Sequence, residues 1–188
     1  RLSKPLKVNR HKPEILIAGC GTGQHSLGTA HLFKGSKVVA IDLSLSSLAY
    51  AIRKSSSLSV KNIDYLHGDI LDLPALNKKF DLVESVGVLH HMADPYIGWS
   101  TLVDCVKPGG LMKIGLYSEI ARSHIVKIRQ EINTNSISST SEAMKSFRET
   151  LKDSVKADHL AILASMDFYD LNSFRDLLFH VQEHRYTI

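Results

Sequence analysis

Five short, mostly apolar runs constrain the fold of this 188-residue chain more than any other feature. They are residues 15–18, 38–41, 80–83 and 111–116, with a weaker run at 63–66. Continuous apolar runs of this length are typical of strands that are buried on both faces, as in a parallel sheet. Because stretches of helical spacing lie between them, the chain is predicted to be an α/β protein: a doubly wound, mostly parallel sheet with helices on both faces.

Three helices are predicted between these strands. Their apolar residues span 27–33, 45–52 and 97–106. Ser44 is suited to cap the start of the second helix, and Gly35 the end of the first. In such a fold, ligands bind at the carboxyl ends of the strands, near the point where the strand order reverses.

The last third of the chain has a different pattern. From Ser118 onward no strand-like run is evident, and apolar stripes at 144–151 and 160–166 predict helices. The expected organisation is a basic tail (1–13) and one domain (14–188), which divides into a core (14–117) and a helical lid that sets specificity (118–188).

Composition narrows the functional classes. The chain carries 23 Lys and Arg against 19 Asp and Glu, but five of the cations lie in residues 1–13, which hold no acid. The remainder is close to neutral, which argues against a surface built for nucleic acid. No apolar run approaches the ~18 residues of a membrane helix, and no signal-peptide core opens the chain. The two cysteines, Cys20 and Cys105, fit a reducing compartment, so a cytoplasmic location is expected.

The glycine-rich segment after the first predicted strand is the strongest functional signal. Gly19, Gly21 and Gly23 alternate with other residues just before the first predicted helix. Glycines there permit a tight turn and let a ligand approach the main chain, and the helix start offers free N–H groups. The spacing differs from the Gly-x-Gly-x-x-Gly of dinucleotide-binding loops, and the ending of a phosphate loop is missing. We expect a nucleotide-like ligand across this turn.

Two acidic residues follow the next two predicted strands. Asp42 ends the second strand, 19 residues beyond Gly23, where a carboxylate can accept hydrogen bonds from both hydroxyls of a ribose. Its alternative role is to cap the next helix. Asp69, between Gly68 and Ile70, follows the third strand, where an acid can receive an exocyclic amine while its apolar neighbour covers a ring.

Taken in order, these motifs resemble those of class I S-adenosylmethionine-dependent methyltransferases. The resemblance covers about residues 14–117 and also rests on segments 80–83, 88–91 and 107–110. It implies a Rossmann-like fold in which the glycines hold the methionine part of the cofactor, Asp42 binds the ribose, and Asp69 with its neighbour binds the adenine. The cofactor-binding residues that it implies are Gly19, Cys20, Gly21, Thr22, Gly23, Gln24, Asp42, Leu43, Gly68, Asp69, Ile70 and Ser85.

The catalytic residues are less specified. Methyl transfer is an in-line displacement that needs alignment and exclusion of water, and a base only if the acceptor must lose a proton. His90 and His91 follow the fourth strand, near the expected methyl group, and are the candidate bases; alternatively they brace the loop. His180 and His184 stand at helical spacing, but no further ligand lies at a diagnostic distance in the sequence, so no metal is expected.

A second resemblance concerns the end of the chain. Residues 167–169 and 175–184 resemble the tail of methyltransferase domains joined to tetratricopeptide repeats, which implies fusion to or association with such repeats. The family's sheet normally finishes with an antiparallel hairpin after the fifth strand. No such strands are found here, which leaves open that the chain stops before them.

The leading hypothesis is an S-adenosylmethionine-dependent methyltransferase whose acceptor, a small molecule or a protein, is not identified. Two alternatives stay open. One is a cofactor-binding or interaction module with little or no catalysis. The other is a nicotinamide-dependent oxidoreductase, which the glycine spacing disfavours, as does the absence of a Tyr-x-x-x-Lys pair at Tyr117, where Ala121 takes the place of the lysine.

Overall fold

The computed structural model describes residues 12–187, so the expected basic tail lies almost entirely outside the described residues. The chain divides into two compact units, one that runs through Leu116 and one that begins at Tyr117. Each unit has an apolar core of its own. No helix between residues 12 and 187 is long and apolar enough to cross a membrane.

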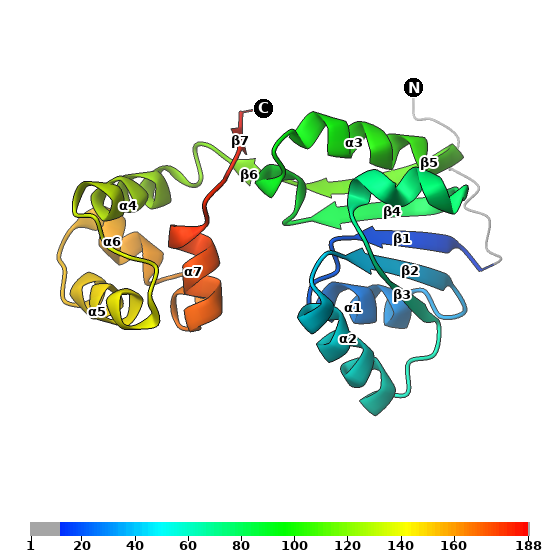
Figure 1. The fold of residues 1–188 in the computed structure, drawn as a ribbon, viewed down its shortest axis with the longest axis horizontal. Helices are drawn as coiled ribbons and strands as arrows, with labels where there is room; N and C mark the ends of the chain where they lie inside the picture. Colours follow the sequence, from blue (N-terminus) through cyan, green and yellow to red (C-terminus); the bar gives the residue numbers. More distant parts are fainter. Residues whose placement is uncertain (1–11, 188) are drawn as a thin grey trace, which may run out of the picture. The chain divides into compact units, whose positions relative to one another are not determined.

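The first unit is a five-stranded parallel sheet with helices on both faces, as predicted (Figure 1). Its strands are β1 (Glu14–Ala18), β2 (Lys37–Asp42), β3 (Ile63–His67), β4 (Phe80–Val86) and β5 (Val106–Gly115). They lie in the order β3-β2-β1-β4-β5, and every neighbouring pair is parallel. The order reverses at β1 and β4, where this kind of sheet leaves a crevice for a ligand.

Alternation along β1 explains the two layers of helices. Successive side chains of a strand point to opposite faces. Ile15 and Ile17 therefore pack with α1 (Gln24–Leu32) and α2 (Leu45–Ser57), whereas Leu16 and Ala18 pack on the other face. That second face is covered by the 3₁₀ turns η1 (Ile70–Leu76) and η2 (Leu89–His91) and by α3 (Pro95–Asp104).

Of the two helix caps predicted from the sequence, one is confirmed and one is wrong. Ser44 caps α2 as predicted, because its Oγ accepts the Ser47 N–H at 3.2 Å. The prediction for Gly35 is wrong: α1 ends at Leu32, and Phe33 is the capping residue. Gly35 instead occupies the turn that follows, with φ +84°.

The fifth strand begins earlier than predicted. A helix to Val106 and a strand from Leu111 are expected, but α3 ends at Asp104 and β5 starts at Val106. Val106 pairs with Phe80, and Leu111 with Leu82, so β5 carries extra residues relative to β4. A bulge of this kind accommodates turn-forming residues inside a strand.

The second unit is helical, as expected, around a separate apolar core. It contains α4 (Ser123–Thr134), α5 (Ser141–Lys152), α6 (Ala157–Ile162), the 3₁₀ turn η3 (Met166–Phe168) and α7 (Leu171–Phe179). The predicted stripe at 144–151 is buried in that core. The helix predicted over 160–166 is confirmed only for its first three residues, because α6 ends at Ile162. His180 and His184 lie beyond α7 and so do not share a helix face.

Two short strands in the second unit contradict the expectation of no strand from Ser118 onward. They are β6 (Tyr117–Ser118) and β7 (Arg185–Tyr186), which pair in parallel as a separate two-stranded sheet. Two residues are too few to show a period of two in the sequence. Within residues 12–187, no antiparallel hairpin extends the larger sheet beyond β5.

Candidate active site

The glycine turn joins β1 to α1 in a conformation that favours glycine at three positions. Gly19, Gly21 and Gly23 have φ values of +79°, +51° and +87°. A Cβ on Gly19 would lie 2.1 Å from Cγ2 of Val88, so the turn packs tightly against the segment after β4. The sequence spacing therefore reflects both backbone geometry and close packing.

Asp42 fixes this turn to the end of β2. Its Oδ2 accepts the Gly21 N–H at 2.7 Å, and its Oδ1 accepts the Ser44 N–H at 2.8 Å. The sequence did not predict that Asp42 would hold the glycine turn in place. Each carboxylate oxygen can accept a second hydrogen bond, so the same side chain can also receive ribose hydroxyls.

Asp69 stands at the corresponding point after β3. Its Oδ1 accepts the Leu71 N–H at 2.9 Å and caps η1, which uses one of its two oxygens. Ile70, the next residue, is buried. Asp69 and Ile70 both line the cavity described below.

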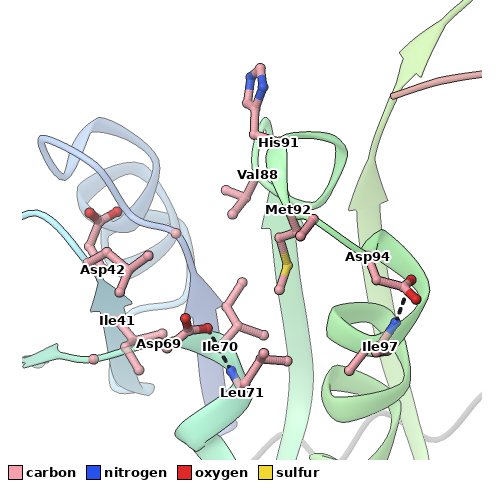
Figure 2. Close-up of a pocket in the computed structure, with 14 residues that line it drawn as sticks. Ile41, Asp42, Asp69, Ile70, Leu71, Val88, His91, Met92, Asp94 and Ile97 are labelled. Atoms are coloured by element: carbon pink, nitrogen blue, oxygen red, sulfur yellow. Dashed lines mark hydrogen bonds between the residues drawn. The ribbon is translucent and has the colours of Figure 1, made fainter. Parts of the chain in front are cut away.

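A cavity of about 450 Å³ runs along these residues. Figure 2 shows Asp42 and Asp69 on one side and Val88, His91 and Met92 on the other. The predicted residues that line it are Gly19, Asp42, Leu43, Gly68, Asp69, Ile70 and His91. The predicted residues that are not among its lining are Cys20, Gly21, Thr22, Gly23, Gln24, Ser85 and His90.

The far wall of the cavity was missed by sequence reasoning. It comes from the segment between β4 and α3 and from the first turn of α3, and its lining residues that were not predicted are Val88, Met92, Ala93, Asp94 and Ile97. Ile41 on β2 and Leu71 on η1 also line the cavity and were not predicted. Most are apolar residues without a chemical signature. Asp94 could have been found as a helix cap, since it accepts the N–H groups of Tyr96 and Ile97.

The two candidate bases have different surroundings. His90 is fully buried, whereas His91 lines the cavity. Their rings meet edge to face with centroids 4.4 Å apart. His91 is therefore the histidine that a ligand in the cavity can reach.

Cys20 and Ser85 are both buried near the turn. Burial, followed by the negative charge of Asp42, raises the pKa of the Cys20 thiol to about 12, so the thiol stays protonated at neutral pH. Protonated thiols are poor nucleophiles, so Cys20 is not placed to act as one. Ser85 Oγ makes no hydrogen bond to any residue between 12 and 187.

A buried carboxylate behind the turn links α1 to the sheet. Glu84, on β4, has an oxygen 2.8 Å from His25 Nε2 and accepts the Thr29 hydroxyl at 3.0 Å. Lys113 Nζ lies 3.6 Å from its other oxygen. His25 is not among the lining residues of the cavity. Its contact with Glu84 attaches the first turn of α1 to β4. Among residues 12–187, no group of three or more His, Cys, Asp or Glu is placed to bind a metal.

Comparison with known proteins identifies the first unit. A family model described as a methyltransferase domain matches residues 15–110, about half of the chain. The chain belongs to this family. The match of this methyltransferase domain includes the glycine turn, Asp42, Asp69 and both histidines, of which Gly19, Asp42, Asp69 and His91 line the cavity.

Individual relatives agree with this assignment. An uncharacterised protein of Synechococcus sp. is 37% identical over 64% of this chain, which covers 29% of the relative. A ubiquinone biosynthesis O-methyltransferase of Cereibacter sphaeroides is 36% identical over 59% of this chain and 43% of its own length. The chain thus spans less than half of these two relatives. The solved structure of PKMT2 from Rickettsia typhi, in complex with AdoHcy, has the same fold, with a TM-score of 0.73 at 18% identity over 94% of this chain and 37% of its own.

Proposed function

We propose that this methyltransferase domain binds S-adenosylmethionine and transfers its methyl group to an acceptor that is a small molecule or a protein. The observation that carries the proposal is the placement of Asp42 and Asp69, at the ends of neighbouring strands, along one cavity with Gly19. A nucleoside needs hydrogen-bond acceptors for its sugar and its amine, and apolar walls for its base. Membership of the methyltransferase domain family adds support.

The residues present fit such a ligand. A Cβ built on Gly21 would meet nothing within 4 Å, so the space beside the turn is open to an approaching group. Asp42 and Asp69 keep lone pairs beyond their bonds to backbone N–H groups. Ile70 and Met92 supply apolar surface to the cavity between the two sides.

In the proposed reaction the cofactor supplies the reactive group, and the protein binds and orients it. The bound cofactor supplies a methyl group activated by its sulfonium. The glycine turn and the two acids bind and orient the nucleoside, and the apolar walls exclude water from the reacting atoms. His91 can accept a proton from the acceptor at an imidazole nitrogen, while the buried His90 holds the loop that carries it.

Titration calorimetry tests the binding step. S-adenosylmethionine and S-adenosylhomocysteine are expected to bind the 188-residue chain, and NAD is not. Asp42→Asn and Asp69→Asn should each weaken binding by about 10- to 100-fold, because each removes a charge-assisted hydrogen bond of about 1.5–3 kcal/mol. Asp64→Asn is the control, since Asp64 is exposed on β3 and does not line the cavity. Binding of NAD in place of the sulfonium compound would favour an oxidoreductase.

Turnover is tested separately from binding. Transfer of a labelled methyl group to proteins and to small-molecule pools is measured with the wild-type chain and with His91→Ala. A base at His91 predicts that the rate of transfer falls by a much larger factor than the affinity for the cofactor. Cofactor binding without transfer to any acceptor would instead favour the binding-module alternative.

We also propose that the domain is associated with tetratricopeptide repeats and acts in the cytoplasm. The resemblance of residues 167–169 and 175–184 supports association with tetratricopeptide repeats, and two buried free thiols, Cys20 and Cys105, support action in the reducing cytoplasm. Sequencing the complete transcript checks the first, and imaging of the tagged full-length protein checks the second.

A further inference from the structure

Three arginines of the second unit converge on one buried carboxylate. Only 1% of the Glu183 side chain is exposed. Arg122 donates to it from Nε at 3.1 Å and from Nη2 at 2.7 Å, and Arg185 donates from Nη1 at 3.3 Å. Arg129 Nη1 lies 3.5 Å from the same carboxylate. Three guanidiniums and one carboxylate leave two positive charges in excess, and we call these four residues the arginine cluster.

No other ion pair among residues 12–187 neutralises this excess. Every ion pair that these arginines form in the described chain ends on Glu183. Arg122 also lies over the ring of Tyr117, 3.6 Å from its centroid, and Arg129 Nη2 donates to the His180 carbonyl. These neutral partners orient the guanidiniums without cancelling their charge.

Burial makes the unbalanced charge costly. Desolvation lowers the pKa of Arg129, although Glu183 opposes that shift. Desolvation raises the pKa of Glu183, but the hydrogen bond and charge of Arg122 outweigh it, so the net pKa lies below its ordinary value. Charged groups removed from water are normally paired. Within residues 12–187, Glu183 is the only carboxylate that forms an ion pair with the arginine cluster.

The cluster also holds donors that the described residues do not use. Arg185 Nε makes no hydrogen bond to any residue between 12 and 187, and Arg129 Nη1 makes only the 3.5 Å ion pair with Glu183. These two nitrogens are themselves buried, but the side chains are 19% and 27% exposed, so an anion reaches the guanidiniums at their exposed edges. A guanidinium presents its donors as a planar fork that matches a carboxylate or a phosphate.

We propose that the arginine cluster is a binding site for the oxyanion group of a ligand, a carboxylate or a phosphate. Glu183 and Arg122 form its base, and Arg129 and Arg185 receive the anion, which supplies the missing negative charge. This site belongs to the second unit alone, and it does not depend on the proposed methyl transfer.

An NMR titration of the 188-residue chain tests the site. Inorganic phosphate and acetate are added separately at pH 7, and potassium chloride at matched ionic strength corrects for screening. Saturable shifts are expected at the resonances of Arg129 and of residues 183–186. Arg185→Gln and Arg129→Gln should each reduce the affinity at least 10-fold. Lys127→Gln is the matched control, because Lys127 lies two residues from Arg129 on α4 but pairs with Asp158.

The stability of the same variants separates a ligand site from a merely structural cluster. Removing one excess charge from a ligand site leaves the melting temperature without added anion unchanged or raised. A structural cluster predicts a lower melting temperature with anion binding retained. That result, or shifts no larger than those with potassium chloride, would overturn the proposal. The relative response to phosphate and acetate identifies which oxyanion the site prefers.

Discussion

Replacing Gly19 with alanine probes the contact between the glycine turn and the segment after β4. The new Cβ would lie 2.1 Å from Cγ2 and 2.9 Å from Cγ1 of Val88. Residue 19 also has φ +79°, a conformation that costs a residue with a Cβ about 1–2 kcal/mol. Forcing a methyl group into a packed position costs about 1–3 kcal/mol more. Gly19→Ala is therefore expected to destabilise the first unit by about 2–5 kcal/mol.

A double-mutant cycle separates these two contributions. Val88→Ala removes the two methyl groups that collide and leaves only its Cβ, 3.0 Å from the new methyl group, so in that background Gly19→Ala should cost little more than the backbone part, about 1–2 kcal/mol. The expected coupling energy between the sites is about 1–3 kcal/mol. Gly21→Ala is the control, because its Cβ would meet nothing and its cost is backbone strain alone.

Urea unfolding followed by tryptophan fluorescence is the assay. Trp99 is the only tryptophan and lies on α3, against the core of the first unit, so its signal reports that unit. Equal costs for Gly19→Ala with and without Val88→Ala would refute the packing described for the turn.

Three further predictions concern ionisable groups. The hydrogen bonds and charges of Lys107 and Lys78 lower the pKa of Glu14 to about 2. Because the unfolded pKa is about 4.3, this stabilisation should be complete above pH 5 and be lost as the pH falls toward 2, and Glu14→Gln should flatten that slope in urea unfolding. Glu84→Gln should lower the free energy of unfolding by about 1–3 kcal/mol, since it weakens the buried bonds to α1. Cys20 and Cys105 are buried with raised pKa values, so neither should react with a thiol reagent at pH 8 until the chain unfolds.

Each of these has an outcome that contradicts it. If the free energy of unfolding of Glu14→Gln falls with pH as steeply as that of the wild-type chain, the ion pairs at the start of β1 do not stabilise the fold. Asp64→Asn, at an exposed position, is the comparison for Glu84→Gln, and equal effects would show that Glu84 does not hold α1. Rapid modification of a native cysteine would contradict the burial of that thiol.

The strands and the glycine turn were readable from the sequence for a physical reason. A fully buried strand needs an unbroken apolar run such as 15–18, and a turn with three positive φ values favours glycine at each of them. Ser44 was readable because a side-chain cap acts within three residues. Local rules were enough in these cases.

Contacts between distant residues were not readable. The bond from Gly21 to Asp42 spans 21 residues and exists only once β2 lies beside β1. Val88 and Met92 line the cavity, but apolar side chains carry no mark of what they face. The arginine cluster joins Arg122 to Glu183 across 61 residues, and no pattern in the sequence connects them.

A crystal structure of the 188-residue chain grown with saturating S-adenosylhomocysteine shows whether the cavity holds the nucleoside. We expect adenosyl density in the cavity, with the ribose hydroxyls at hydrogen-bond distance from Asp42 and the adenine amine at hydrogen-bond distance from Asp69. Density at another place, or a cavity without the compound in crystals where calorimetry shows no binding, would contradict it.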